Sequence, residues 1–257
     1  ARILLAARQG RHLLPGLPGD CRPRDVEQAY AVQDRLIELM GAEAGGAELG
    51  GWFVAATNVE IQAKLGLEGP YWARLLAAAL HPSPASLPAA DFLTITLEVE
   101  FAFRLGRDLP PRERPYEAHE VAAAVATTHP AIEVVSSHFE DWTKLDAPSL
   151  IADNGTDGAL VFGKGVADWR TLDLKALEVS LSVNGEVVRE GLGARALGDP
   201  LAAFTWLANA RAARGEGLRA GHIHNTGTCT GMYLASPGDE AVADFGPLGE
   251  ARVSFPI

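Results

Sequence analysis

The feature that most constrains the fold is a strict alternation along residues 92–104. Every second residue from Leu93 to Phe103 is apolar, and the intervening positions from Thr94 to Arg104 are mostly polar or charged. A period of two is typical of a β-strand that buries one face. Because a strand cannot satisfy its backbone hydrogen bonds alone, this segment predicts a sheet that gathers partner strands from elsewhere in the chain.

Other segments indicate fewer helices than strands. The first 25 residues, rich in Pro, Gly and Arg, predict an irregular lead-in, and glycines predict a loop over 41–51. We expect helices at 26–40 after Asp25, at 59–65 after Asn58, at 71–80, at 117–128 and from Asp199-Pro200 to Gly215, a strand at 131–137 and a hairpin at 177–191 turning at Asn184-Gly185. This mixture favours an α+β fold with antiparallel or mixed sheets. The proline-rich segment 81–88 predicts a boundary between an N-terminal helical or mixed lobe, 1–85, and a second domain, 86–257.

Charge and composition exclude several classes of protein. The 257 residues include 22 Lys and Arg against 33 Asp and Glu, a net charge of −11 without a segregated basic patch, so nucleic-acid binding is not expected. Two cysteines, Cys21 and Cys229, cannot build a disulfide framework, which favours a reducing compartment. We find no apolar run of membrane-spanning length and no secretory signal, and we therefore expect a cytoplasmic protein.

Two glutamates lie on the polar face of the alternating segment. Glu98 and Glu100 are two residues apart, so their side chains point to the same side, roughly 6–7 Å apart. Such neighbours raise each other's pKa unless a cation lies between them, and carboxylates suit Mg²⁺, Mn²⁺ or Ca²⁺ better than zinc. Glu133, inside the apolar segment AIEVV, is a third candidate ligand. The alternative is a solvated strand face with scattered glutamates, and it stays open because one sequence does not show which strands pair.

Longer motifs carry a resemblance to a known family. In order they are LEVEFAFRLGRDL (97–109), PAIEVVSSHFEDW (130–142), ADNG (152–155) and TGTCTGMYLASPGDEAVADFGPLGEARVSF (226–255), preceded by AYAVQDRL (29–36). The chain resembles the fumarylacetoacetate hydrolase superfamily over nearly its whole length, and within it the branch of 2-keto-4-pentenoate hydratases and 4-oxalocrotonate decarboxylases. The resemblance implies a mixed β-roll or sandwich in residues 86–257 with a small N-terminal α/β lobe, assembled as a homo-oligomer.

The same resemblance implies a metal site and a substrate. Glu98, Glu100 and Glu133 would hold Mg²⁺ or Mn²⁺, on which a 2-oxo acid chelates while the metal stabilises the enolate. The turn Thr226-Gly227-Thr228, together with Thr57, would bind the substrate carboxylate. Asp153 would lie close to the site. Each of these segments has a simpler interpretation, since both Thr-Gly-Thr and Asp-Asn-Gly are common turns.

The resemblance is imperfect at positions next to the predicted site. The family's lysine on an early strand is Phe53 here, and its acidic residue is missing from the segment EGPYWAR (68–74). After the strand that carries Glu133 the family often has an arginine, and this chain has His138 there. Before the Thr-Gly-Thr turn the family often has an aspartate, and this chain has His222. Three explanations remain: an apolar or aromatic substrate tail near Phe53, Tyr71 and Trp72; acid–base work moved to His138 or His222; or a metal site without the standard activity. Replacement lysines to consider are Lys64, Lys144 and Lys164.

Three functions follow as hypotheses. The first is a metal-dependent lyase, hydratase or decarboxylase, acting on a 2-oxo or 2-hydroxydienoate acid, with His138 and Asp153 as catalytic candidates. The second is hydrolysis of a C–C bond in an acylpyruvate, which needs a general base to activate water. The third is a catalytically weakened paralogue that binds a 2-oxo acid or serves as the partner subunit of a related hydratase or decarboxylase.

Overall fold

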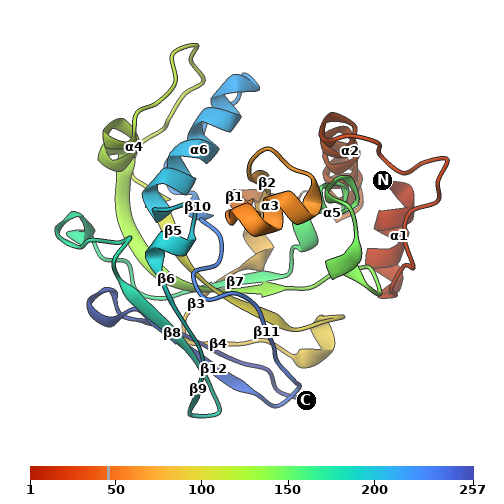
Figure 1. Ribbon diagram of the computed structural model, residues 1–257. Coiled ribbons are helices and arrows are strands. Elements are labelled where there is room, and N and C mark those ends of the chain that lie inside the picture. Colours follow the sequence, from red (N-terminus) through yellow and green to blue (C-terminus); the bar gives the residue numbers. More distant parts are fainter. Residues whose placement is uncertain (45–46) are drawn as a thin grey trace.

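Two β-sheets packed against each other form the centre of the protein, seen in a computed structural model that describes residues 1–44 and 47–257 (Figure 1). The larger sheet has the order β2-β1-β10-β5-β6-β7-β3, and β11 pairs with another part of β5. Its strands are β1 (Leu49–Ala55), β2 (Tyr71–Leu76), β3 (Leu80–Pro82), β5 (Thr96–Leu105), β6 (Val125–Val135), β7 (Ala159–Phe162), β10 (Ile223–Asn225) and β11 (Tyr233–Leu234).

The second sheet is smaller and mostly antiparallel. Its order is β4-β13-β12-β8-β9, with β4 parallel to β13. These strands are β4 (Ala85–Ser86), β8 (Glu178–Val183), β9 (Glu186–Leu192), β12 (Glu240–Asp244) and β13 (Glu250–Ser254). β8 and β9 form the predicted hairpin, in which Asn184 and Gly185 take φ of 52° and 85° as a tight turn of this type requires.

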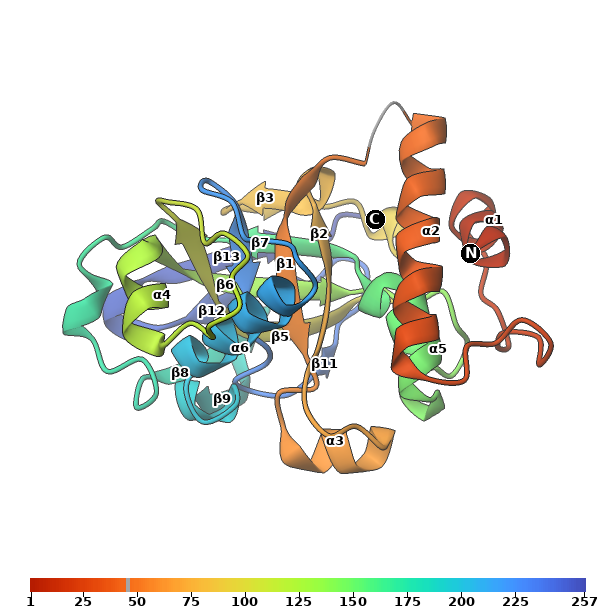
Figure 2. The same ribbon diagram turned by 90° about the horizontal axis from the view of Figure 1, so that it is seen from above.

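The described residues form six α-helices, of which α1, α2 and α5 gather at one end of the molecule (Figure 2). They are α1 (Arg2–Gly10), α2 (Val26–Ala44), α3 (Val59–Leu65), α4 (Ala118–Ala124), α5 (Ala147–Ala152) and α6 (Pro200–Ala213). Within the described residues, no helix combines the length and apolar character needed to cross a membrane.

The two faces of β5 have different partners, as its alternating sequence predicts. Leu97, Val99, Phe101 and Phe103 are buried, and the ring of Phe101 meets that of Phe245, beyond β12, edge to face at 4.9 Å between centroids. This apolar side joins the two sheets in one core. Glu98 and Glu100 lie on the opposite side, in a cavity that residues of β1, β2 and α3 also line. The sheet pairing therefore decides where the carboxylates go.

Several local predictions are confirmed by capping contacts. The side chains of Asp25, Asn58 and Asp199 accept hydrogen bonds from the first-turn amides of α2, α3 and α6. Gly66 ends α3 and Gly215 follows α6, both with positive φ. These elements are defined by local hydrogen bonds, which is why residue type alone finds them.

Other local predictions are wrong where tertiary contacts decide. The lead-in contains α1, whose Leu4, Leu5 and Ala7 are buried, and residues 71–76 form β2 rather than a helix because they pair with β1. The predicted helix over 117–128 ends at Ala124, and β6 begins there, earlier than the predicted strand at 131. The predicted loop over 41–51 is shortened by α2 and β1 at its two ends, and residues 45–46 lie outside the described residues.

The larger sheet draws strands from both predicted domains. β1, β2 and β3 come from residues 1–85, and β5, β6, β7, β10 and β11 come from residues 86–257. β10 lies between β1 and β5 and hydrogen-bonds to both. The division into lobes 1–85 and 86–257 stays a prediction about independent folding units.

Candidate active site

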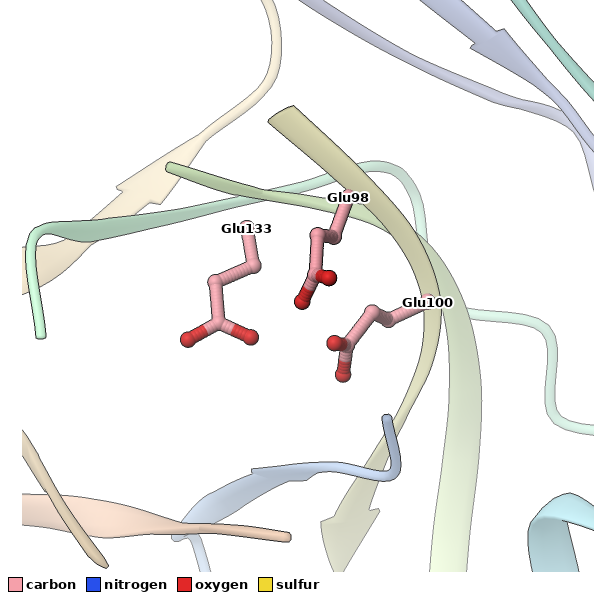
Figure 3. A group of neighbouring side chains, drawn as sticks. All are labelled: Glu98, Glu100 and Glu133. Atoms are coloured by element: carbon pink, nitrogen blue, oxygen red, sulfur yellow. The ribbon is translucent and has the colours of Figure 1, made fainter. Parts of the chain in front are cut away.

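Three carboxylates converge on one face of the larger sheet (Figure 3). Glu98 and Glu100 project from the same side of β5, and Glu133 projects from β6, where it is the direct cross-strand partner of Glu98. One oxygen of each carboxylate lies within 4.8 Å of those of the other two. Glu100 is 1% exposed and Glu133 is 7% exposed, so the solvated-strand alternative does not describe this face.

Burial and mutual repulsion make the ionised forms of these groups unfavourable. Burial, followed by the charge of Glu100, raises the pKa of Glu98 to about 8. Burial also raises the pKa of Glu100, partly offset by hydrogen bonds that favour its ionised form, and it raises the pKa of Glu133 well above its ordinary value with help from the two neighbouring charges. The three groups therefore require either protons or a cation.

Two donors, at the end of β10 and just after it, hold two of the three carboxylates in place. The Asn225 amide nitrogen donates to Oε2 of Glu100 at 2.9 Å and to Oε2 of Glu133 at 3.0 Å. The backbone N–H of Gly227 donates to the same oxygen of Glu100 at 2.7 Å. The amide oxygen of Asn225 is buried without a hydrogen-bond partner among the described residues. Asn225 was not singled out in the sequence, although a polar residue ending the short buried strand IHN was a usable signal.

The carboxylates form part of the lining of a cavity of about 140 Å³. Tyr71 and Phe53 from β2 and β1 flank them, and Gly227 and Thr228 form another part of the wall. Most of the remaining lining is apolar: Val54, Ala55, Ala56, Ile61, Leu65, Val135, Trp142, Leu150, Gly155 and Met232. A charged group at one place and an apolar surface around it is typical of a small-molecule site.

The predicted carboxylate-binding residues are brought to this cavity with one exception. Thr57, Gly227 and Thr228 line it, whereas Thr226 is fully buried and its hydroxyl donates to the carbonyl of Phe101. Gly227 has φ of 93°, and a Cβ there would lie 2.2 Å from the Thr57 hydroxyl oxygen. A glycine is therefore needed for the turn to approach Thr57. The binding role of these four residues remains a prediction.

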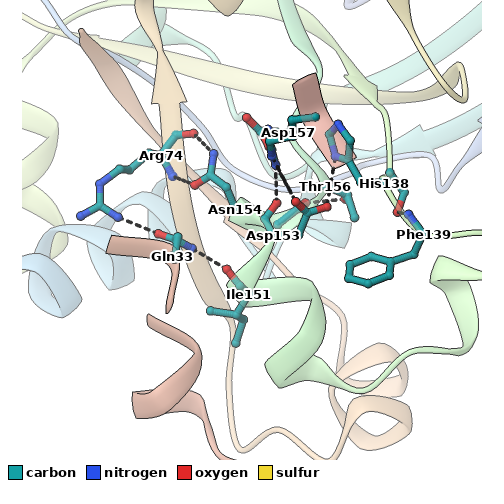
Figure 4. Close-up of polar contacts among 12 residues, drawn as sticks. Gln33, Arg74, His138, Phe139, Ile151, Asp153, Asn154, Thr156 and Asp157 are labelled. Atoms are coloured by element: carbon teal, nitrogen blue, oxygen red, sulfur yellow. Dashed lines mark hydrogen bonds and ion pairs between the residues drawn. The ribbon is translucent and has the colours of Figure 1, made fainter. Parts of the chain in front are cut away.

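His138 and Asp153 lie together but outside the residues that line the cavity (Figure 4). His138 Nδ1 is 3.2 Å from Oδ2 of Asp153, whose other oxygen accepts from the guanidinium of Arg8 at 2.9 Å. Arg8 also pairs with Asp157 at 2.6 Å. Burial alone would raise the pKa of Asp153, but the charges of Arg8 and His138 outweigh it and hold that pKa below its ordinary value. Neither residue is in contact with the three glutamates, and the catalytic role of His138 and Asp153 stays a prediction.

This charged cluster supports the turn that follows it. Asn154 exchanges hydrogen bonds of 2.9 Å with the backbone N–H and carbonyl of Arg74, and residues 154–156 all take positive φ (Figure 4). Gly155 and Thr156 line the cavity. A Cβ on Gly155 would lie 2.9 Å from the Phe53 ring, so the turn packs directly on that ring. The cluster thus shapes one wall of the cavity from behind.

Some of the residues at which the chain departs from the family pattern line the cavity, and others do not. Phe53 is 2% exposed and lines the cavity, as does Tyr71, while Trp72 stacks on Tyr30 with 3.9 Å between ring centroids and does not line it. Of the candidate lysines, only Lys64 contributes to the lining, and its ammonium donates to the carbonyl of Thr143 at 2.9 Å. His222 is absent from the lining as well.

The donor set fits a hard divalent cation. Each of the three carboxylates offers an oxygen within 4.8 Å of the other two, and no basic side chain among the described residues compensates their repulsion. Asn225 and Gly227 both donate to Oε2 of Glu100, which orients this carboxylate within the trio. Oxygen-only ligands of this kind suit Mg²⁺ or Mn²⁺.

A family model described as the C-terminal part of fumarylacetoacetate (FAA) hydrolase matches residues 70–255. The chain belongs to the fumarylacetoacetate hydrolase family. Its α+β architecture of two packed sheets is that family's fold, and the resemblance found in its motifs is confirmed.

Similar members of the family are hydratases and a decarboxylase. The chain is 31% identical to a 2-keto-4-pentenoate hydratase of Burkholderia vietnamiensis and 31% identical to a 2-hydroxyhexa-2,4-dienoate hydratase of Comamonas testosteroni, each time over 99% of this chain and 95% of the other. A solved structure of 4-oxalocrotonate decarboxylase from Pseudomonas putida G7, complexed with magnesium and adipate, superposes with a TM-score of 0.88 at 27% identity, covering 99% of this chain and 97% of that one.

Proposed function

We propose that the protein is a divalent-metal-dependent hydratase acting on a 2-hydroxydienoate or its 2-oxo tautomer. The observation that carries the proposal is the trio Glu98, Glu100 and Glu133 in a cavity whose remaining wall is mostly apolar. The whole-length similarity to hydratases of such acids supports the substrate class. We propose Mg²⁺ or Mn²⁺ as the ion, which agrees with the magnesium in the similar decarboxylase.

Different residues of the cavity would bind different parts of the substrate. The bound ion, when present, supplies Lewis-acid stabilisation of the negative charge that develops on the 2-oxo acid. Thr228 and Thr57 offer hydroxyl donors beside Gly227, whose own N–H donates to Glu100, at a place suited to the substrate carboxylate. The apolar wall from Ile61 to Trp142 would surround the hydrocarbon end of the substrate and limit the water that reaches it.

Decarboxylation is the second candidate, because the similar structure is a decarboxylase bound to a dicarboxylate. A dicarboxylate substrate would place a second negative charge in the outer part of the cavity, where it needs a cation. Lys64 is the single basic residue among the described lining residues, and it already donates to Thr143. This lining favours a substrate with an uncharged tail and therefore hydration.

The remaining hypotheses are less well supported by the lining. C–C hydrolysis by a histidine-assisted water finds no histidine among the described residues of the cavity wall. A weakened paralogue is motivated by Phe53 alone. If Phe53→Lys stays folded and metal-loaded but is no more active on any dienoate tested, that motivation is lost.

Assembly and location complete the proposal. We place the protein in the cytoplasm as a homo-oligomer, or as a partner of a related hydratase or decarboxylase subunit. Val187, Leu192 and Leu234 on β9 and β11 are exposed apolar side chains at sheet edges, and such edges favour association.

The first experiment is calorimetric titration of metal-free protein with Mn²⁺ and Mg²⁺, followed by oxalate, a mimic of the 2-oxo acid. We expect oxalate to bind only after the metal. The metal-loaded protein is then incubated with 2-hydroxypenta-2,4-dienoate, and we expect a hydrated product that retains its carboxylate. Release of CO₂ from a 2-oxo dicarboxylate, with no turnover of the dienoate, would instead identify a decarboxylase, and failure to bind either metal or oxalate would refute the lyase proposal.

A further inference from the structure

Tyr71 differs from the other tyrosines in what its hydroxyl contacts. The hydroxyl of Tyr30 accepts from the backbone N–H of Trp72 at 3.1 Å, and that of Tyr116 donates to the carbonyl of Pro110 at 2.5 Å. Tyr233 is only half-buried. Tyr71 is 6% exposed, yet none of the described residues shares a hydrogen bond with its hydroxyl.

The Thr128 hydroxyl and the Trp169 indole nitrogen are enclosed without a partner, whereas the Tyr71 hydroxyl is not enclosed in this way and keeps accessible surface. Tyr71 begins β2 opposite Ala55 of β1, and its side chain lines the cavity that contains Glu98, Glu100 and Glu133. The polar end of the ring therefore belongs to the space where a ligand would bind. A ligand oxygen would supply the missing partner.

The neighbouring position offers no substitute donor. Phe53 pairs with Ala73 and Ala55 pairs with Tyr71 in the antiparallel ladder, which puts Phe53 and Tyr71 on one face of the sheet as diagonal neighbours. The Phe53 ring cannot donate a hydrogen bond. A phenol, whose ordinary pKa is about 10, keeps its proton near neutral pH and offers one donor without adding a charge among the carboxylates.

Resting on the proposed function, we propose that the Tyr71 hydroxyl donates a hydrogen bond to an anionic oxygen of the bound 2-oxo acid, either its carboxylate or the enolate oxygen. Such a donor is fixed in place before the ligand arrives. Its contribution grows as negative charge develops on the enolate, so Tyr71 contributes to turnover as well as to affinity.

The test compares Tyr71→Phe with Tyr30→Phe, a matched control that removes a buried hydroxyl already used by the fold. Each metal-loaded variant is titrated with oxalate in a calorimeter after its Mn²⁺ affinity has been measured. For Tyr71→Phe we expect Mn²⁺ affinity within about twofold of the wild type and oxalate affinity lower by about 10- to 100-fold, the usual range for a hydrogen bond to a charged group. For Tyr30→Phe we expect unchanged oxalate affinity and reduced thermal stability.

Other outcomes have distinct meanings. Oxalate binding by Tyr71→Phe within twofold of the wild type would overturn the inference and leave the proposed function standing. Absence of metal-dependent oxalate binding by the wild type would overturn both. If Tyr71→Phe does not fold, the near-ultraviolet difference spectrum of the metal-loaded Tyr30→Phe variant decides: a tyrosine band shifted by oxalate supports the inference, and an unshifted band overturns it.

Discussion

Two groups of charges, each of buried and half-buried side chains, lie on opposite sides of the wall formed by residues 154–156. Behind it, Arg8, His138, Asp153 and Asp157 pair with one another, and the pKa of Asp153 is lowered. In front of it, Glu98, Glu100 and Glu133 repel one another, and their pKa values are raised. In the first group each carboxylate is paired with the Arg8 guanidinium, whereas the second group has no basic partner among the described residues and needs a cation from outside. Buried charge thus indicates a binding site only where the protein leaves it uncompensated.

The largest expected effect comes from removing one of the uncompensated glutamate charges, which tests whether the trio binds a cation. Glu100→Gln is expected to lower Mn²⁺ affinity by at least about 100-fold and to abolish turnover, because a direct ligand is lost. Calorimetry and a dienoate absorbance assay measure the two effects. Metal binding and turnover at wild-type levels in this variant would show that the trio is not the metal site.

Removing a charge from the paired group should act on stability instead. Arg8→Leu leaves Asp153 buried without its main cation, so we expect a loss of about 3 kcal/mol in the free energy of unfolding, measured with urea. Arg35→Ala, which breaks an exposed pair with Glu38, is the control and should cost less than about 1 kcal/mol. An Arg8→Leu variant as stable as the control would mean that the cluster is not needed for the fold.

The raised pKa of Glu98 gives the metal-free protein a defined pH dependence. Folding lifts this pKa from 4.5 to about 8, so the native state holds a proton that the unfolded chain releases, and stability is lost as pH rises through that interval. Between pH 6 and pH 8 we expect a loss on the order of 1–2 kcal/mol without metal. Saturating Mg²⁺ should raise the melting temperature more at pH 8 than at pH 6, and the reverse order would contradict the assignment.

The smallest expected effect comes from the basic residue of the cavity lining. Lys64 is exposed and bound to the Thr143 carbonyl, so Lys64→Met should change kcat/KM for a dienoate within about fivefold. A 100-fold loss would show that Lys64 replaces the lysine absent at Phe53. Retained activity on dienoates with lost activity on dicarboxylates would mean that Lys64 binds a distal carboxylate.

Sequence patterns located the carboxylates better than the residues around them. The alternation along β5 placed Glu98 and Glu100 on one face, because a strand's period of two follows from backbone geometry. The pairing of Glu133 with Glu98 depends on strand register, which a single sequence does not encode locally. Asn225 was missed for the same reason, since its role arises from β10 entering the sheet beside β5.

Aromatic and alanine-rich segments were the least predictable. Residues 71–76 have no strict alternation and were predicted as helix, but pairing with β1 makes them a strand. That error hid Tyr71, whose position in the cavity follows only from β2. His138 and Asp153 were named through the family resemblance. The contact of Asp153 with Arg8 could not be foreseen, because α1 was predicted to be irregular.

The position of β10 bears on the order in which the protein can be completed during synthesis. This strand joins β1 to β5, yet it comes from residues 223–225, after almost all of its sheet partners have left the ribosome. A nascent chain ending at residue 220 would lack both the strand that connects the two halves of the sheet and the Asn225 amide that holds the glutamates. The ability to bind metal would therefore arise late, only after Asn225 and Gly227 had been added to the chain.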